Sequence, residues 1–264
     1  MILTHIGGPT VLVELDGWRL LTDPTFDPAG GRYAFAWRSS TAKLTGPAVP
    51  VAELPPIDAV LLTHDHHADN LDRSGRALLA SAGAVVTTVS GARRLAGTGD
   101  VRGLAAGTST VLAGNADRAA LSVTATPARH GPPLSRPVVG DVIGFAVRVG
   151  DAARVALWVT GDTVLYRPLR SMASSMAVDV ALVHVGGVRF GITGPLRYTM
   201  TGRDAVSLIG LTGPRAAVPV HYEGWSHFAD GPAGLDAALA AAPDDVRARV
   251  RRLPLGTPTE IDLG

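Results

Sequence analysis

Three of the eight histidines in this chain lie in one octapeptide, residues 63–70, with the sequence Thr-His-Asp-His-His-Ala-Asp-Asn. The preceding segment, residues 57–62, is a short apolar run that follows two prolines, a pattern that indicates a buried strand. The histidines therefore begin where a strand ends. Imidazole nitrogens and carboxylate oxygens are ligands that zinc and its neighbours in the first transition row accept. The octapeptide thus predicts a metal site at the end of this strand.

Four more imidazole or carboxylate side chains occur at the same kind of place, at the end of an apolar, strand-like run. They are His130 after 121–126, Asp162 after 155–161, His184 at the end of 180–183 and His221 at the end of 218–220. A single histidine at a strand end is more often a structural residue. Because the pattern repeats, we expect these strands to lie side by side and the four side chains to meet at one sheet edge.

Composition restricts both the ligands and the partners. The chain has no cysteine, so it forms neither disulfides nor a thiolate metal site. Its formal net charge of +1 gives no electrostatic support for binding to nucleic acid or to a membrane surface. The N-terminus lacks the cationic region of a signal peptide, and no apolar stretch is long enough to span a bilayer. We expect a soluble, cytoplasmic protein that acts on a small-molecule substrate; the sequence leaves the oligomeric state open.

The order of predicted elements indicates a single domain over residues 1–264, with two mixed β-sheets flanked by helices. Residues 10–15 and 18–21 form two strands joined by a hairpin turn at Asp16-Gly17. After the 57–62 strand we expect a helix over 72–82 and a strand over 84–89. Further strands are expected at 110–112, 119–126, 142–149 and 155–160, as an antiparallel meander, and then a strand at 178–183, a helix at 203–211, a strand at 217–220 and a helix at 234–241.

Residues 27–56 have little periodicity and are rich in glycine, proline, serine and threonine, which predicts a long loop of the kind that often forms a lid or a binding surface. Aromatic residues gather in or next to it: Phe26, Tyr33, Phe35 and Trp37. They either anchor the loop to the body of the protein or form a wall of a substrate pocket.

Taken together, these motifs resemble the metallo-β-lactamase-fold hydrolases, in the branch similar to the ascorbate-lactonate hydrolases and the phospholipase D-like members. The matching residues follow the family's order along nearly the whole chain: Thr4-His5-Ile6-Gly7, Leu20-Leu21-Thr22-Asp23-Pro24, the octapeptide, His130, Gly161-Asp162-Thr163 and Pro219-Val220-His221-Tyr222. The resemblance implies a four-layer αββα sandwich with one or two divalent metal ions, zinc in the first place and manganese or iron as alternatives. It also implies that a metal-bound hydroxide hydrolyses a small ester, lactone or phosphodiester.

The resemblance also implies a set of site residues. The first ion is held by His64, by either His66 or His67, and by His130. The second is held by Asp69 and His221, Asp162 bridges the two ions, and Asp69 additionally orients the attacking hydroxide as a catalytic residue. Asp23 supports the ligands from behind. His184 is either a catalytic residue that contacts substrate or a structural one, whereas a structural role is preferred for His5, Tyr222, Trp225 and His227.

The octapeptide departs from the family pattern His-x-His-x-Asp-His in two ways. Counted from the strand end, His64 and His66 fit and Asp69 comes one residue late; counted back from Asp69, His67 fits instead. Asn70 stands where the pattern has a histidine, and a neutral amide is a poor ligand for zinc. Three outcomes follow: a dinuclear hydrolase with substituted ligands, a mononuclear hydrolase, or a non-catalytic relative that binds metal or another ligand.

Overall fold

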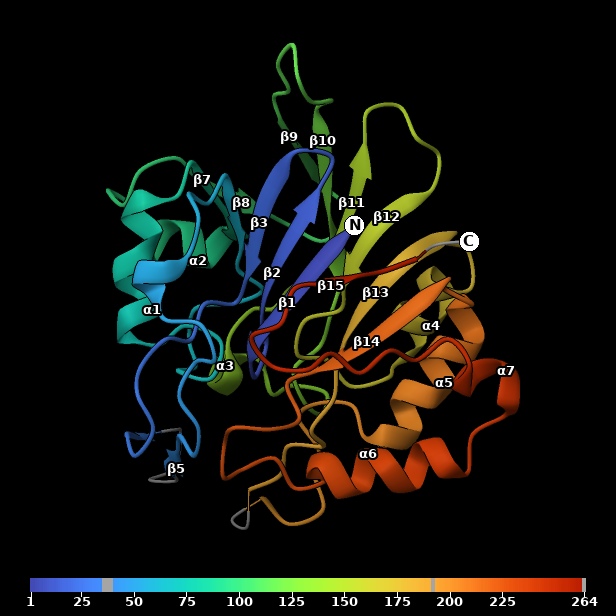
Figure 1. The fold of residues 1–264 in the computed structure, drawn as a ribbon. Coiled ribbons are helices and arrows are strands. Elements are labelled where there is room, and N and C mark those ends of the chain that lie inside the picture. The colour runs from blue at the N-terminus through green and yellow to red at the C-terminus, as the bar shows by residue number, and fades with distance from the viewer. Residues whose placement is uncertain (35–39, 191–192, 263–264) are drawn as a thin grey trace.

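The computed structural model describes residues 1–34, 40–190 and 193–262, and two β-sheets packed face to face form its centre (Figure 1). The first sheet contains seven strands in the order β15-β1-β2-β3-β6-β7-β8. Their bounds are β1 (Ile2–Gly7), β2 (Thr10–Leu15), β3 (Trp18–Thr22), β6 (Ala59–Leu61), β7 (Ala84–Thr88), β8 (Val101–Leu104) and β15 (Thr259–Glu260). Strand β2 is antiparallel to its neighbours β1 and β3, and β3, β6, β7 and β8 are parallel.

The second sheet contains six strands in the order β14-β13-β12-β11-β10-β9. Their bounds are β9 (Ser109–Leu112), β10 (Leu121–Pro127), β11 (Ile143–Val149), β12 (Val155–Val159), β13 (Val178–His184) and β14 (Ala216–Val220). The predicted antiparallel meander is confirmed for β9 to β12, whereas β12, β13 and β14 are parallel. Both sheets are therefore mixed, as the order of elements predicts.

Helices cover the outer face of each sheet (Figure 1). The first sheet carries α1 (Arg73–Leu78) and α2 (Val89–Arg94), and the second carries α4 (Arg167–Ala173), α5 (Gly202–Thr212), α6 (Gly231–Ala240) and α7 (Asp244–Arg247). Because both faces of these sheets are covered, the central part of β13, residues 180–183, is a continuous apolar run rather than an alternating one. Val180 and Leu182 point into the core between the sheets, and Ala181 and Val183 pack under the helices. The predicted four-layer αββα sandwich is confirmed.

Several element boundaries differ from the prediction. The helix predicted over 72–82 ends at Leu78 and continues as a 3₁₀ turn over Leu79–Ser81. The strand predicted over 84–89 ends at Thr88, because the Thr88 hydroxyl accepts a hydrogen bond from the Gly91 amide and so starts α2. The Asp16-Gly17 hairpin is confirmed, with φ values of 50° and 76° that match the favoured two-residue turn.

The segment predicted as a bare loop, residues 27–56, contains a hairpin of β4 (Arg32–Ala34) and β5 (Ser40–Ala42) and a 3₁₀ turn at Val51–Glu53. Its contacts favour the anchoring interpretation of the aromatics, since Phe26 is buried in the first sheet's outer core and the Tyr33 ring packs 5.1 Å from that of Trp225. Phe35 and Trp37 lie outside the described residues. In the described ranges, no helix combines the length and apolarity needed to cross a membrane.

A short helix, α3 (Arg136–Val139), lies in the connection between β10 and β11. This connection also carries His130 and therefore lies next to the edge at which the sequence places the metal site.

Candidate metal centre

The side chains predicted from strand ends meet at one edge of the sandwich. His64 follows β6 of the first sheet, whereas His130, Asp162 and His221 follow β10, β12 and β14 of the second. Strands β10, β12 and β14 run in the same direction, because β10 and β12 are each antiparallel to β11 and β14 is parallel to the others through β13. Their carboxyl ends therefore share an edge, and the two sheets together surround the site.

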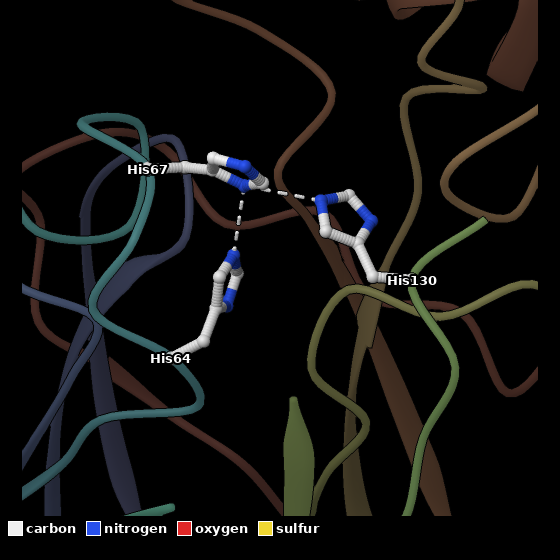
Figure 2. Close-up of side chains that lie close together, drawn as sticks. All are labelled: His64, His67 and His130. Carbon is white, nitrogen blue, oxygen red and sulfur yellow. Dashed lines mark hydrogen bonds between the residues drawn. The ribbon is translucent and has the colours of Figure 1, made fainter. Parts of the chain in front are cut away.

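Three histidines form the first cluster (Figure 2). The His67 Nδ1 atom lies 3.2 Å from His64 Nε2 and 3.1 Å from His130 Nε2. Ligands of a tetrahedral ion at 2.0–2.1 Å are separated by about 3.3 Å, which is close to these two distances. One nitrogen of each ring lies within 4.8 Å of the others, so the three rings could hold one metal ion.

The structure thus brings His67, and not His66, next to His64 and His130. The His66 side chain is partly exposed, and its Nδ1 faces Asp65 Oδ1 at 3.7 Å. The one-residue insertion between His64 and Asp69 therefore lies before His67, which is the second of the two alignments that the sequence allows.

Backbone contacts orient the rings of this cluster. The His130 Nδ1 atom lies 2.8 Å from the carbonyl oxygen of Tyr198, and since that oxygen only accepts, Nδ1 is the donor. The unprotonated nitrogen of neutral His130 is then Nε2, the atom that faces His67. Such an outer hydrogen bond is typical of metal-binding histidines.

Asp69, Asp162 and His221 form the second cluster, with one ligand atom of each within 4.8 Å of the others. His221 Nε2 lies 3.2 Å from Asp69 Oδ2, and His130 Nε2, in the first cluster, lies 3.9 Å from Asp162 Oδ2. All three side chains are buried, yet both oxygens of Asp162 and Oδ1 of Asp69 accept no hydrogen bond from any residue in the described ranges. Buried carboxylate oxygens of this kind require a partner, and a divalent ion between the clusters fits the donor set.

Comparison with known proteins agrees with this geometry. The family model described as the beta-lactamase superfamily domain matches residues 18–222, which include every residue of both clusters. The chain belongs to the beta-lactamase superfamily.

Relatives of this superfamily member have names that refer to metal-dependent hydrolysis. A protein of Caldivirga maquilingensis named UPF0173 metal-dependent hydrolase is 28% identical over 87% of this chain and 86% of its own. A protein of the same name from Herpetosiphon aurantiacus is 27% identical over 97% of this chain and 92% of its own. The crystal structure of an isothiocyanate hydrolase from Delia radicum gut bacteria shares the fold, with a TM-score of 0.79 at 20% identity over 99% of both chains.

Burial and like charges keep the first cluster of this superfamily member uncharged. Loss of solvent and the neighbouring histidines lower the pKa of His67 to about 4 and that of His130 to about 3. In the second cluster, burial lowers the pKa of His221, but Asp162 and Asp69 outweigh it and raise the value to about 9. Burial raises the pKa of Asp162 to about 7. The first cluster therefore offers three neutral imidazoles at neutral pH, the protonation state that metal ions require.

We expect the metal-free protein to lose stability as pH falls below about 6.5. The pKa values of His64, His67 and His130 are lowered in the folded chain, so at these three positions the unfolded chain, with histidine pKa values of about 6.5, binds up to three more protons. The lowered pKa values of His5, His66 and His184 act in the same direction. The raised pKa values of Asp162 and His221 act in the opposite direction, and the free energy of unfolding should fall by at least about 2 kcal/mol between pH 6 and pH 5. Urea denaturation of chelator-treated protein at pH 5, 6 and 7 measures this, and equal values at all three would contradict it.

A polar layer lies behind the clusters. Asp23 is fully buried, and its carboxylate accepts hydrogen bonds from the backbone and hydroxyl of Thr63, the residue before His64. His184 Nε2 lies 3.2 Å from Asp23 Oδ2, and His184 Nδ1 lies 3.4 Å from Thr160 Oγ1. Both nitrogens of the buried His184 ring thus face this layer, and the ring supports Asp23 in this arrangement.

Sequence reasoning assigned His227 a structural role, but the structure places its ring at the second cluster. His227 Nε2 lies 2.9 Å from Asp69 Oδ2. His227 comes from the loop after β14, six residues beyond His221, and follows no strand-like run, so the strand-end pattern that identified the other histidines does not extend to it. The one signal available was a second histidine close to His221 among aromatic residues.

A cavity of about 460 Å³ opens beside His130. Residues at the ends of β7 and β8 and in the 128–143 connection line it, and they are mainly apolar, with Arg129, Arg136 and Asp141 as the charged exceptions. A cavity of this size accommodates a small molecule next to the first cluster.

Proposed function

We propose that this protein is a metal-dependent hydrolase of a small ester, lactone or phosphodiester. The observation that carries the proposal is the pair of adjoining clusters, in which three neutral imidazoles face buried carboxylate oxygens that accept no hydrogen bond from the described residues. Its relatives named metal-dependent hydrolases support the same class of reaction. The finer resemblance to ascorbate-lactonate hydrolases and phospholipase D-like members stays a prediction, as does the cytoplasmic location.

The geometry supports a ligand assignment. His64, His67 and His130 would hold one ion, and Asp69 and His221 a second, with Asp162 between the two. Zinc suits the imidazole cluster, whereas the cluster richer in carboxylates would also suit manganese or iron. When bound, such ions polarise the scissile group and lower the pKa of a bound water.

The residues of the chain itself would orient the reactants. Burial raises the pKa of Asp69, but His227 and His221 outweigh it and hold the value well below the ordinary range, so Asp69 stays ionised at neutral pH. Its Oδ1 accepts no hydrogen bond from the described residues and is positioned to accept one from the attacking water. Asp23, which His184 contacts in turn, would hold the backbone at Thr63 through its hydrogen bond to the Thr63 amide. This contact would orient the side chain of the next residue, His64.

The test is the metal content of protein purified without chelator, measured by plasma mass spectrometry before and after incubation with zinc or manganese. The same samples are assayed on a p-nitrophenyl ester, a lactone and bis-p-nitrophenyl phosphate. One or two ions per chain together with metal-dependent turnover would support the proposal. Metal without turnover of any of the three would favour a non-catalytic binding protein, and no metal under any condition would contradict the proposal.

A matched pair of variants tests which histidine of the octapeptide binds the first ion. We expect His67→Ala to weaken binding of that ion by more than 100-fold, because losing a direct ligand should cost more than the 10–100-fold typical of an outer partner. His66→Ala should leave the metal content unchanged, since the His66 ring faces Asp65 outside the cluster. The reverse result in a zinc titration would mean that the site rearranges when metal binds.

A further inference from the structure

We propose that His227 is a nitrogen ligand of the second ion and takes the place that the family pattern gives to residue 70. The assignment rests on the metal-dependent function proposed above. It starts from an imbalance between the clusters: the first offers three imidazoles, whereas the second offers one imidazole, that of His221, with two carboxylates. A second imidazole at that cluster would make the two sites chemically similar.

Asn70 is poorly suited to this place. Its side chain is fully buried, and its amide nitrogen lies 3.4 Å from Asp23 Oδ2, in the layer behind the clusters. Its Oδ1 accepts no hydrogen bond within the described part of the chain, but a neutral amide oxygen is a weaker zinc ligand than an imidazole. Asn70 is therefore the rival that an experiment has to separate from His227.

The His227 ring approaches the same carboxylate oxygen as His221. The distance from Asp69 Oδ2 is 2.9 Å to His227 Nε2 and 3.2 Å to His221 Nε2. Two imidazole nitrogens thus converge on one oxygen at separations near the roughly 3.3 Å between neighbouring ligands of a tetrahedral zinc ion. Three donors from Asp69, His221 and His227 would then share one ion.

The other side of the His227 ring is held as metal-binding histidines usually are. Its Nδ1 lies 2.6 Å from Thr41 Oγ1, which in turn lies 3.1 Å from Ser226 Oγ. The ring is buried, and it stacks on Phe190 at an interplanar angle of 7° with 6.0 Å between centroids. A hydrogen bond donated by Nδ1–H to Thr41 Oγ1 leaves Nε2 unprotonated and directs it toward the ion, and a fixed ring loses little conformational freedom on binding.

Thr41 belongs to β5, so His227 also connects the 27–56 segment to the second cluster. The segment contains no histidine or cysteine. Its contribution would be to hold the ring of His227 in place.

The experiment compares zinc stoichiometry and affinity, by plasma mass spectrometry and calorimetric titration, in the wild-type protein, His227→Ala, His227→Gln, Asn70→Ala and Thr41→Val. We expect two ions per chain in the wild type and in Asn70→Ala, and a loss of affinity for the second ion of at least 100-fold in both His227 variants, with the first ion retained. Glutamine keeps a hydrogen-bond donor for Asp69 but no imidazole, so it separates a ligand from a residue that only positions Asp69. Thr41→Val should weaken the second ion by 10–100-fold.

Each contrary outcome has a distinct meaning. Two ions with unchanged affinity in His227→Gln would overturn the assignment and leave His227 as a positioning residue. Loss of the second ion in Asn70→Ala alone would assign the place to Asn70. One ion in the wild type would overturn the second site but not the proposed function, whereas no ion in the wild type would contradict the proposed function itself. Thermal unfolding of each variant confirms that it is folded.

Discussion

Replacing Asp162 by asparagine is expected to abolish both metal-dependent turnover and binding of the second ion, and at the same time to stabilise the metal-free protein. Asp162 belongs to the second cluster and faces the first, since its Oδ2 lies 3.9 Å from His130 Nε2. Its Oδ1 lies 3.3 Å from His221 Nδ1, and neither oxygen accepts a hydrogen bond from the described residues. Burial raises its pKa to about 7, which means that the ionised side chain is costly in the folded state. We expect the free energy of unfolding of the metal-free variant to rise by about 1–3 kcal/mol, because the neutral amide avoids the cost of burying an ionised carboxylate.

The size of this stabilisation depends on pH. An aspartate whose pKa is raised on folding destabilises the folded state increasingly from about pH 4, its ordinary pKa, to about pH 7, its folded value. The gain from Asp162→Asn should therefore be largest above pH 7 and small at pH 4, as measured by urea denaturation of chelator-treated protein. The control is Asp179→Asn. Asp179, on β13, forms a partly exposed ion pair with Arg154, and its substitution should change the free energy of unfolding by less than about 1 kcal/mol without affecting metal content. Retained metal-dependent turnover in Asp162→Asn would count against Asp162 as a ligand.

Replacing Lys43 by methionine is expected to destabilise the protein by about 3–5 kcal/mol. Lys43 is the single lysine of the chain, and its Nζ lies 2.8 Å from Asp72 Oδ2 with both side chains almost fully buried. Asp72 also accepts hydrogen bonds from the Asp27 amide and, as the N-terminal cap of α1, from the Gly75 amide. Removal of the lysine would leave a buried carboxylate without its cation.

The control for Lys43 is an exposed pair. Arg102→Met removes the ion pair with Asp100 at the surface and should cost less than about 1 kcal/mol. Adding Asp72→Asn to Lys43→Met should recover part of the loss, because the uncompensated charge disappears with its partner. Equal effects of Lys43→Met and Arg102→Met on urea denaturation would show that the buried pair contributes no more than a surface one.

Much of the fold could be predicted because the sandwich imposes local patterns on its strands. Strands covered on both faces are mainly apolar on both sides, and β6, β7, β12, β13 and β14 are visible in the sequence for that reason. The elements that were missed, such as α2, α4 and β8, are short or lack a clear period. Their position depends on the elements they pack against, because short segments have little intrinsic preference.

The sequence by itself determined which side chains are available for a metal site and that most of them follow strands. This is possible because the pattern is local: each apolar, strand-like run is followed directly along the chain by an imidazole or carboxylate side chain. The gathering of His130, Asp162 and His221 followed from that pattern once the strands lay in one sheet.

Only the tertiary structure decided which of two adjacent histidines faces His64 and His130, and that His227 reaches Asp69. A one-residue insertion in a loop changes the direction of each following side chain, and no local pattern records that direction. His227 and Thr41 are 186 residues apart in the sequence, and their contact exists only because a hairpin of the 27–56 segment packs against the loop after β14. Contacts between irregular segments depend on how the whole sandwich packs. No local sequence pattern predicts which residues of such segments will meet.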